Sequence, residues 1–177
     1  MNANKLLSMI FFLSLLIYGC DKENDNPSQS NNDVIDTASV TLVSNSKHSI
    51  VYQIRNRQII FKLKSNQENA FIDVDVNQNS IINSNYDRMY GSDGSGICVQ
   101  YFIDANSWTV CGGAPSNATA TKSNNDYTFT IPLSELENST SSTSISVGFW
   151  FWSSLNGYTR YPTNENTFSD LFLINTK

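Results

Sequence analysis

The clearest pattern in the chain lies in residues 143–152, where apolar and polar positions alternate. From residue 145 onward the odd-numbered positions are apolar: Ile145, Val147, Phe149 and Phe151. The even-numbered positions begin small and polar and end with Trp150 and Trp152. A period of two predicts a half-buried strand whose odd-numbered side chains face a core. Either a second layer covers the two Trp side chains, or they are exposed as an aromatic platform.

Other short runs of β-branched and aromatic residues begin at residue 39 and are separated by polar residues. Arg55, Asn56 and Arg57 are predicted to form a hairpin loop, and Pro132 to end a strand before at most one helical turn. No amphipathic helical pattern of even about 10 residues occurs in this part of the chain. We therefore expect one all-β domain of about nine short strands, an antiparallel β-sandwich of immunoglobulin-like or jelly-roll-like type. Strands are expected at residues 40–43, 50–54, 59–63, 70–76, 97–104, 108–111, 126–131 and 170–174.

Residues 77–96 are rich in Asn, Ser, Asp and Gly and contain Tyr86, Met89 and Tyr90. Loops longer than about 12–15 residues are uncommon unless they are functional or disordered. This segment is therefore predicted to be a long loop near the site.

The N-terminal residues have the pattern of an export signal: Lys5, an apolar run over residues 6–18, and then Cys20. The run is shorter than the roughly 20 apolar residues that a transmembrane helix needs to span the bilayer. The residues from Ile17 to Cys20 resemble the lipobox of bacterial lipoproteins, which implies a lipid on Cys20. An ordinary secretory signal is the alternative. The predicted organisation is a signal over residues 1–19, a polar flexible tether over 20–37 and the β-sandwich domain over 38–177.

The acidic residues Asp21, Glu23 and Asp25 follow Cys20 directly. They resemble the signal that directs some lipoproteins to the outer face of the outer membrane, so we expect a lipid-anchored outer-membrane protein facing the cell surface or, alternatively, the periplasm. The chain has a net charge of −5, and removal of the signal with Lys5 leaves about −6. An acidic surface argues against nucleic acid as a partner.

Two further cysteines, Cys98 and Cys111, form an even pair in an exported and oxidising setting, which predicts a disulfide. If they face each other across a hairpin, Val99 lies opposite Val110 and Tyr101 opposite Trp108. The turn then falls at residues 104–105. Trp108 is expected to be buried.

Asp73, Asp75, Asn77 and Asn79 alternate along the chain as oxygen ligands of a calcium ion can, with Asp87 or Asp93 as further candidates. The spacing is not that of an EF-hand. The alternative is an Asp- and Asn-rich turn that leaves a strand, which is common.

Aromatic residues continue after the two Trp residues with Tyr158 and Tyr161. A sugar ring stacks its C–H face on aromatic rings, while polar groups bind its hydroxyls. The predicted ligand-binding residues are Trp150, Trp152, Tyr158, Tyr161, Arg160 and Tyr90, with Gln100 and Asn156 as further polar candidates.

Candidate catalytic residues are few. His48 is the only histidine, and we expect it to be a surface turn residue. Glu135 and Glu137 are expected on an exposed turn and do not form the pair across a cleft that glycoside hydrolysis requires. Haem ligation would rest on His48 and Met89, a weak pairing. We expect no enzymatic activity.

Residues 71–77 (F-I-D-V-D-V-N), 96–103 (G-I-C-V-Q-Y-F-I), 127–136 and 145–149 resemble the strand motifs of DOMON-like and family 9 carbohydrate-binding modules. The resemblance covers roughly residues 70–162. It departs from the family at Cys98, which replaces an acidic residue, and in lacking the family's opening D-G-x-x-x-W. It implies a β-sandwich that binds a sugar, haem or another ligand, or that serves as an appended module. Together with the aromatic face, it leads us to expect glycan binding without catalysis. The alternative is a structural or assembly lipoprotein that contacts other envelope proteins through the same face.

Overall fold

The computed structural model describes residues 36–76, 87–104, 107–109, 111–113, 115–136, 143–162 and 171–176, with the side chains of 102–108 excepted. Several predictions lie outside these residues: the signal, Cys20 and most of the tether, together with Asn77, Asn79 and Glu137. The first described residues already belong to the fold. The Thr37 amide donates to the Ile54 carbonyl at 3.0 Å, and the Thr37 hydroxyl accepts from the Ile54 amide at 2.9 Å.

The described residues form twelve strands and one short 3₁₀ helix, η1, at Leu133–Glu135. The helix lies where the sequence predicts at most one turn. The strands are β1 (Val40–Ser44), β2 (His48–Arg55), β3 (Gln58–Ser65), β4 (Asn69–Asp75), β5 (Arg88–Ser92), β6 (Cys98–Asp104), β7 (Ser107–Trp108), β8 (Thr119–Ser123), β9 (Asp126–Pro132), β10 (Ser144–Ser153), β11 (Gly157–Tyr161) and β12 (Phe172–Asn175).

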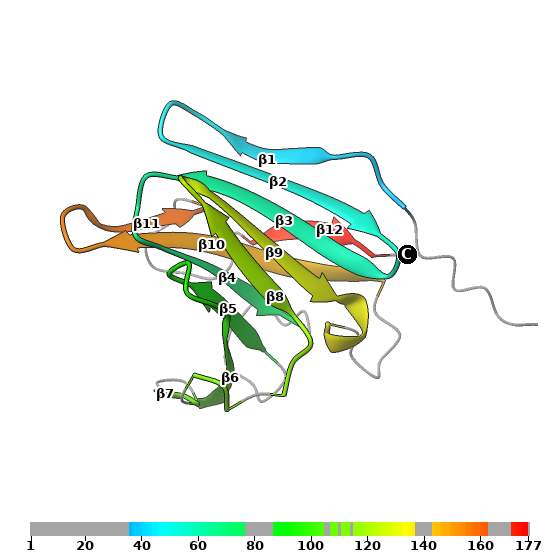
Figure 1. Cartoon of the computed structure of the whole chain (residues 1–177). Helices are drawn as coiled ribbons and strands as arrows, with labels where there is room; N and C mark the ends of the chain where they lie inside the picture. The colour runs from blue at the N-terminus through cyan, green and yellow to red at the C-terminus, as the bar shows by residue number, and fades with distance from the viewer. Residues whose placement is uncertain are drawn as a thin grey trace, which may run out of the picture. The chain divides into compact units, whose positions relative to one another are not determined.

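The strands form two antiparallel sheets that pack face to face (Figure 1). One sheet has five strands in the order β1-β2-β3-β9-β8. The other has seven, in the order β11-β10-β4-β5-β6-β7, with β12 also paired to β10. The predicted all-β sandwich is therefore confirmed.

The core lies between the two sheets and is built from alternate residues of the central strands. The apolar row of β10 is buried as predicted, with Phe149 and Phe151 at 0% exposure. Phe61 of the facing sheet meets Phe149 edge to face, with ring centroids 5.3 Å apart. Ile72 of β4 and Phe129 of β9 are likewise fully buried. Period-two alternation thus fixes which face of each of these strands is apolar.

The predicted hairpin loop between β2 and β3 is confirmed as a two-residue turn at Asn56 and Arg57. Both residues have positive φ, 50° and 58°. A two-residue hairpin favours this backbone because its twist matches that of the flanking strands.

The segment predicted as a long loop at residues 77–96 contains β5, so that prediction is wrong for residues 88–92. β5 is short and has only two large apolar residues, Met89 and Tyr90, before Gly91. β5 pairs with β4 on one side and with β6 on the other. These backbone pairings hold the segment as a strand although its own sequence has a weak strand pattern. β8 was also not predicted, since its sequence T-A-T-K-S has no large apolar residue.

The disulfide between Cys98 and Cys111 is confirmed, with the two Cα atoms 5.0 Å apart. The register of the adjoining hairpin differs by one residue from the prediction. Trp108 pairs with Phe102, not with Tyr101, and an irregularity lies between Phe102 and Asp104. A pairing only two residues long is too short for side-chain alternation to set its register.

Candidate functional site

One surface of the seven-stranded sheet faces away from the five-stranded sheet, and we call it the outer face. It carries the side chains that alternate, along each strand, with the side chains buried in the core. In β10 these include Trp150 and Trp152, which are partly exposed. Trp150 lies opposite Phe71 of β4 and Arg160 of β11, while Trp152 lies opposite Tyr158 of β11.

Aromatic rings from three adjacent strands are in contact on the outer face. Trp150 stacks on Phe71 with ring centroids 3.9 Å apart and an interplanar angle of 13°. Tyr158 lies against both Trp residues, with centroids 5.5 Å from Trp150 and 6.4 Å from Trp152. Tyr158 is 70% exposed. The two Trp rings are therefore neither core nor isolated, because they form part of a continuous aromatic surface.

Asp73 lies beside this surface, and its carboxylate contacts the side chains of Trp150 and Arg160. One carboxylate oxygen, Oδ1, accepts a hydrogen bond from Trp150 Nε1 at 3.2 Å. The other, Oδ2, lies 3.4 Å from Arg160 Nη2 in an ion pair. Burial raises the pKa of Asp73 to about 6, although Arg160 and Trp150 both act to lower it. Asp73 therefore orients the indole and the guanidinium from beneath the exposed surface.

A pocket of about 420 Å³ adjoins Phe71. Gly91 of β5 lies opposite Phe71, and a Cβ atom there would lie 2.8 Å from Cδ1 and Cε1 of the Phe71 ring. Glycine at this position thus lets the Phe71 ring lie over β5. Cys98 and Cys111 also line the pocket. Its polar lining comes from Asn69, Ser92, Asp93 and Ser95.

The structure does not bring all of the predicted ligand-binding residues together. Trp150, Trp152, Tyr158 and Arg160 share the outer face. Tyr90 lies opposite Ile72 on the inward parity and is fully buried. Tyr161 also has the inward parity.

Other polar candidates lie apart from the aromatic surface. The Gln100 side chain donates to the Thr109 carbonyl at 2.5 Å, within the β6 region. Asn156 lies in the turn between β10 and β11, where its amide donates to Ser153 Oγ at 3.1 Å.

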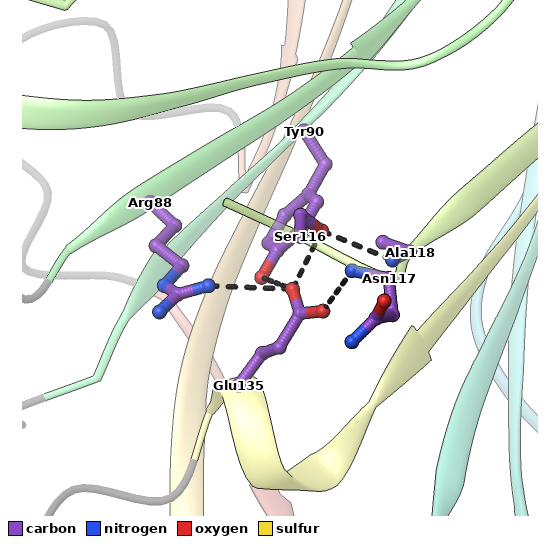
Figure 2. A network of polar contacts seen from close by, with 6 residues as sticks. All are labelled: Arg88, Tyr90, Ser116, Asn117, Ala118 and Glu135. Carbon is purple, nitrogen blue, oxygen red and sulfur yellow. Dashed lines mark hydrogen bonds and ion pairs between the residues drawn. The ribbon is translucent and has the colours of Figure 1, made fainter. Parts of the chain in front are cut away.

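Tyr90 belongs instead to a polar network around Glu135 (Figure 2). Glu135 Oε2 accepts hydrogen bonds from the Tyr90 hydroxyl and Arg88 Nη1, both at 3.3 Å, and from Ser116 Oγ at 2.7 Å. Oε1 accepts from the Asn117 amide at 2.5 Å. Burial raises the pKa of Tyr90, so its hydroxyl stays protonated as a donor. The prediction that Glu135 lies on an exposed turn is wrong, because this carboxylate links η1 to β5 and to the segment before β8.

The prediction that His48 is a surface turn residue is also wrong. His48 begins β2 and is only 3% exposed. Its ring stacks on Phe151 of the other sheet, with centroids 4.6 Å apart, and its Nδ1 lies 3.0 Å from the Tyr161 hydroxyl. Asn45 supports the same cluster by donating to that hydroxyl at 3.0 Å. His48 thus connects the two sheets at one end of the sandwich.

The predicted calcium ligands are only partly described. Asp73 and Asp75 share the outer parity of β4 and are both buried. Asp87 is also buried and accepts a hydrogen bond from the Val76 amide at 3.1 Å. Asp93 is exposed and accepts from the Ser95 amide and hydroxyl. Within the described ranges no group of three acidic, His or Cys side chains is arranged to hold a metal ion. Asn77 and Asn79 lie outside these ranges, so calcium binding stays a prediction.

Phe71, Asp73 and Gly91 are members of the candidate site that the sequence did not assign to glycan binding, although it made Asp73 a candidate calcium ligand. Alternation along β4 predicts that Phe71 and Asp73 lie on the face of the strand opposite to its core residues. Nothing in the sequence shows, however, that β4 pairs with β10 and so brings these residues beside the Trp pair.

In the part of the chain that the structure describes, no helix has the length and apolar character needed to cross a membrane. No known protein-family model matches the sequence, and a comparison with curated proteins finds no significant match.

Proposed function

We propose that this domain binds a neutral glycan on the outer face of the seven-stranded sheet and performs no catalysis. The observation that carries the proposal is the continuous aromatic surface of Phe71, Trp150, Trp152 and Tyr158. Pyranose rings present an apolar C–H face that packs on such rings, while their hydroxyls need polar partners at the edge. The motif resemblance to family 9 carbohydrate-binding modules points to the same class of ligand.

The charge of the face favours a neutral glycan over an acidic one. The chain has a net charge of −5. Arg160, a cation of the aromatic surface, is already paired with Asp73. An anionic polysaccharide would have to displace Asp73 or approach an acidic protein without local compensation. The hydroxyls of a neutral sugar can instead hydrogen-bond to the outer edge of the Arg160 guanidinium, which is partly exposed.

The location of this activity follows from the N-terminal pattern. A lipid on Cys20 and a polar tether before residue 38 would hold the domain at the outer membrane, on the cell-surface side. In that position the aromatic surface would meet extracellular polysaccharide. Calcium at the Asp73–Asn79 segment is an additional proposal that the binding of glycan does not require.

The test is a glycan array followed by titration calorimetry on the full-length protein in detergent. Tyr158→Ala is the first variant, because Tyr158 is 70% exposed and contributes little to the core. Trp152→Ala is the second. Leu155→Ala is the matched control, since Leu155 is 90% exposed in the adjoining turn but lies outside the aromatic contacts described above.

Loss of one stacking ring should weaken binding about tenfold, which corresponds to 1.4 kcal/mol. The Leu155 variant should bind as the wild type does. If both aromatic variants bind the same glycan as tightly as the wild type, the outer face is not the site. If no glycan binds and a stoichiometric envelope protein co-purifies through Tyr158 and Trp152, the alternative of a structural or assembly lipoprotein replaces this proposal.

A further inference from the structure

We infer that protonation of His48 detaches the C-terminal end of β11 from the five-stranded sheet, so that acidification loosens the strand that carries Tyr158 and Arg160. The opening of this strand end does not depend on any ligand. Its effect on glycan binding at the outer face rests on the proposed function and adds a regulation by pH to it.

β11 lies at an edge of the seven-stranded sheet, where β10 is its strand partner (Figure 1). An edge strand has one row of backbone hydrogen bonds, so side-chain contacts contribute strongly to holding its end. Tyr161, the last residue of β11, makes such contacts. Its hydroxyl lies 3.0 Å from His48 Nδ1 and accepts a hydrogen bond from Asn45 Nδ2 at 3.0 Å. These contacts bridge the two sheets at the end of the sandwich where β1 turns into β2.

The hydrogen bonds around Tyr161 favour a neutral His48 ring. Asn45 Oδ1 accepts from the backbone amides of Lys47 at 2.9 Å and His48 at 2.8 Å, which identifies it as the oxygen. The Asn45 nitrogen must therefore be the donor to the Tyr161 hydroxyl. Since that hydroxyl already accepts one hydrogen, it donates its own to His48 Nδ1. Nδ1 is an acceptor only when the imidazole is neutral and its hydrogen lies on Nε2.

Protonation of His48 breaks this arrangement. The added hydrogen lies on Nδ1, so the ring no longer accepts from Tyr161. His48 is 3% exposed, and its Nε2 is buried with no hydrogen-bond partner among the described residues. A charged ring in this position is poorly solvated, and it reaches water when the strand end moves away.

The charged groups around His48 add to this penalty. Burial lowers the pKa of His48, and Lys47 lowers it further. Lys64 of β3 lines the same pocket as His48, and the described residues that line this pocket include no acidic side chain. Asp126 of β9 lies opposite Lys64 in the register. From β10 and β11 the ring meets two uncharged aromatic rings, and the Arg160 side chain is paired on the outer face.

The lowered pKa of the buried ring gives the direction of the effect. A ring that is freed from the core titrates near the ordinary His value of 6.5, whereas the ring of the closed form titrates below it. The open form therefore binds protons more readily. The ratio of open to closed strand rises as the pH falls below 6.5, at most about tenfold per pH unit, until the closed form titrates as well.

Opening of β11 changes the outer face. Arg160 directly precedes Tyr161 and lies opposite Trp150, while Tyr158 lies opposite Trp152. A strand end that has left β2 no longer positions these side chains against the two Trp rings. The affinity for glycan should therefore fall on acidification.

Hydrogen exchange followed by mass spectrometry tests the opening on full-length protein in detergent, at about pH 7.5 and about pH 5.5. Exchange rates are corrected for the intrinsic effect of pH. His48→Phe keeps a ring against Phe151 but cannot be protonated. Tyr161→Phe removes the hydroxyl that meets His48. Tyr52→Phe is its matched control, because Tyr52 also belongs to β2 but packs against Phe61 of β3.

In the wild type, protection of the β11 amides should fall about tenfold between the two pH values, while that of the β3 amides stays constant. His48→Phe should show no such fall. Asp73 is present in both proteins, so its own titration does not affect the comparison. Tyr161→Phe should lower protection already at the higher pH, whereas Tyr52→Phe should behave as the wild type does. Constant protection of β11 in the wild type, or an equal fall in His48→Phe, overturns the inference.

Titration calorimetry at the same two pH values, with a glycan that the array identifies, follows the effect on binding. Acidification should weaken binding by the wild type up to about tenfold more than binding by His48→Phe. If a glycan binds and the exchange of β11 does not depend on pH, this inference fails and the proposed function stands. If β11 opens on acidification but no glycan binds at either pH, the proposed function fails and the opening of the strand stands.

Discussion

The indole of Trp150 lies flat against the ring of Phe71, with the two ring centroids 3.9 Å apart. The residues face each other across β10 and β4 and are separated by 79 positions in the chain. Stacked aromatic pairs contribute about 0.5–1.5 kcal/mol beyond the burial of their area. This contact therefore couples the strand that carries the Trp pair to the strand that borders the pocket.

A double-mutant cycle with Phe71→Ala and Trp150→Ala should give a coupling energy of about 1 kcal/mol in the free energy of unfolding. Urea denaturation of the wild type, the two single variants and the double variant measures it. A parallel cycle of Phe71→Ala with Leu155→Ala should be additive, since Leu155 lies in the turn after β10. Equal coupling in both cycles would mean that the stack contributes nothing specific.

Asp73 should make the stability of the protein depend on pH. Its pKa in the folded state is about 6, against 3.8 in the unfolded chain, mainly because it is buried. Folding therefore favours the protonated carboxyl, and this contribution is full below pH 3.8 and is lost as the pH rises through about 6. The difference corresponds to about 3 kcal/mol. Relative to Asp73→Asn, the wild type should lose stability by this order between pH 4 and pH 7 in urea unfolding. Parallel pH curves for the two proteins would contradict the assignment.

His48 should contribute a pH dependence of the opposite sign. Burial lowers the pKa of His48 in the folded state, and the neighbouring Lys47 acts in the same direction. The unfolded chain then binds more protons, so the contribution of His48 is present above pH 6.5 and is lost as the pH falls.

His48→Phe keeps a ring against Phe151 but cannot be protonated. The stability of the wild type relative to this variant should fall as the pH is lowered from about 7 to 5, as thermal unfolding followed by circular dichroism would measure. Tyr161 retains its hydrogen bond from Asn45 in the variant, which limits the loss of the polar contact. A constant difference across this range would show that His48 does not titrate in the folded protein.

Removing the disulfide with Cys98→Ala and Cys111→Ala together should lower the free energy of unfolding by about 3 kcal/mol. The bridge closes a loop with a sequence separation of 13 and thereby restricts the unfolded chain. A reducing agent should produce the same loss in the wild type and none in the double variant. A loss in the double variant under reduction would point to an effect unrelated to the bridge.

Glu135→Ala should destabilise the fold by about 3 kcal/mol, because it leaves Arg88 and the Tyr90 hydroxyl without their shared acceptor in a largely buried site. Glu68→Ala is the comparison, since Glu68 is exposed and its carboxylate binds Ser154 at the surface. It should cost less than about 1 kcal/mol. Chemical denaturation of both variants measures their free energies of unfolding. Equal losses in the two variants would contradict the predicted contribution of the network.

The core was predictable from local sequence because burial on one face leaves a period of two in each strand. Phe149 and Phe151 in β10, and Ile72 and Val74 in β4, carry that pattern and are buried as it predicts. Two further features could be predicted from the sequence, because each depends on residue type and on short spacing. They are the turn at Asn56 and Arg57 and the Cys98–Cys111 disulfide.

Other elements could not be predicted because their order comes from distant partners. β5 has a sequence typical of a loop and becomes a strand between β4 and β6. His48 has polar neighbours in sequence, yet Phe151 and Tyr161 bury it from the other sheet. Glu135 follows a Pro-ended strand and is nevertheless enclosed by Arg88, Tyr90 and Ser116.

The residues of the candidate site also fall into a part that the sequence predicts and a part that it does not. The sequence alone determined that Trp150 and Trp152 share a face opposite the core, because alternation along one strand is a local property. Only the tertiary structure decided that Phe71 stacks on Trp150, that Asp73 pairs with Arg160, and that Gly91 leaves room for the Phe71 ring. These contacts depend on which strands are neighbours and in which register, and strand neighbours are set by the packing of the whole chain.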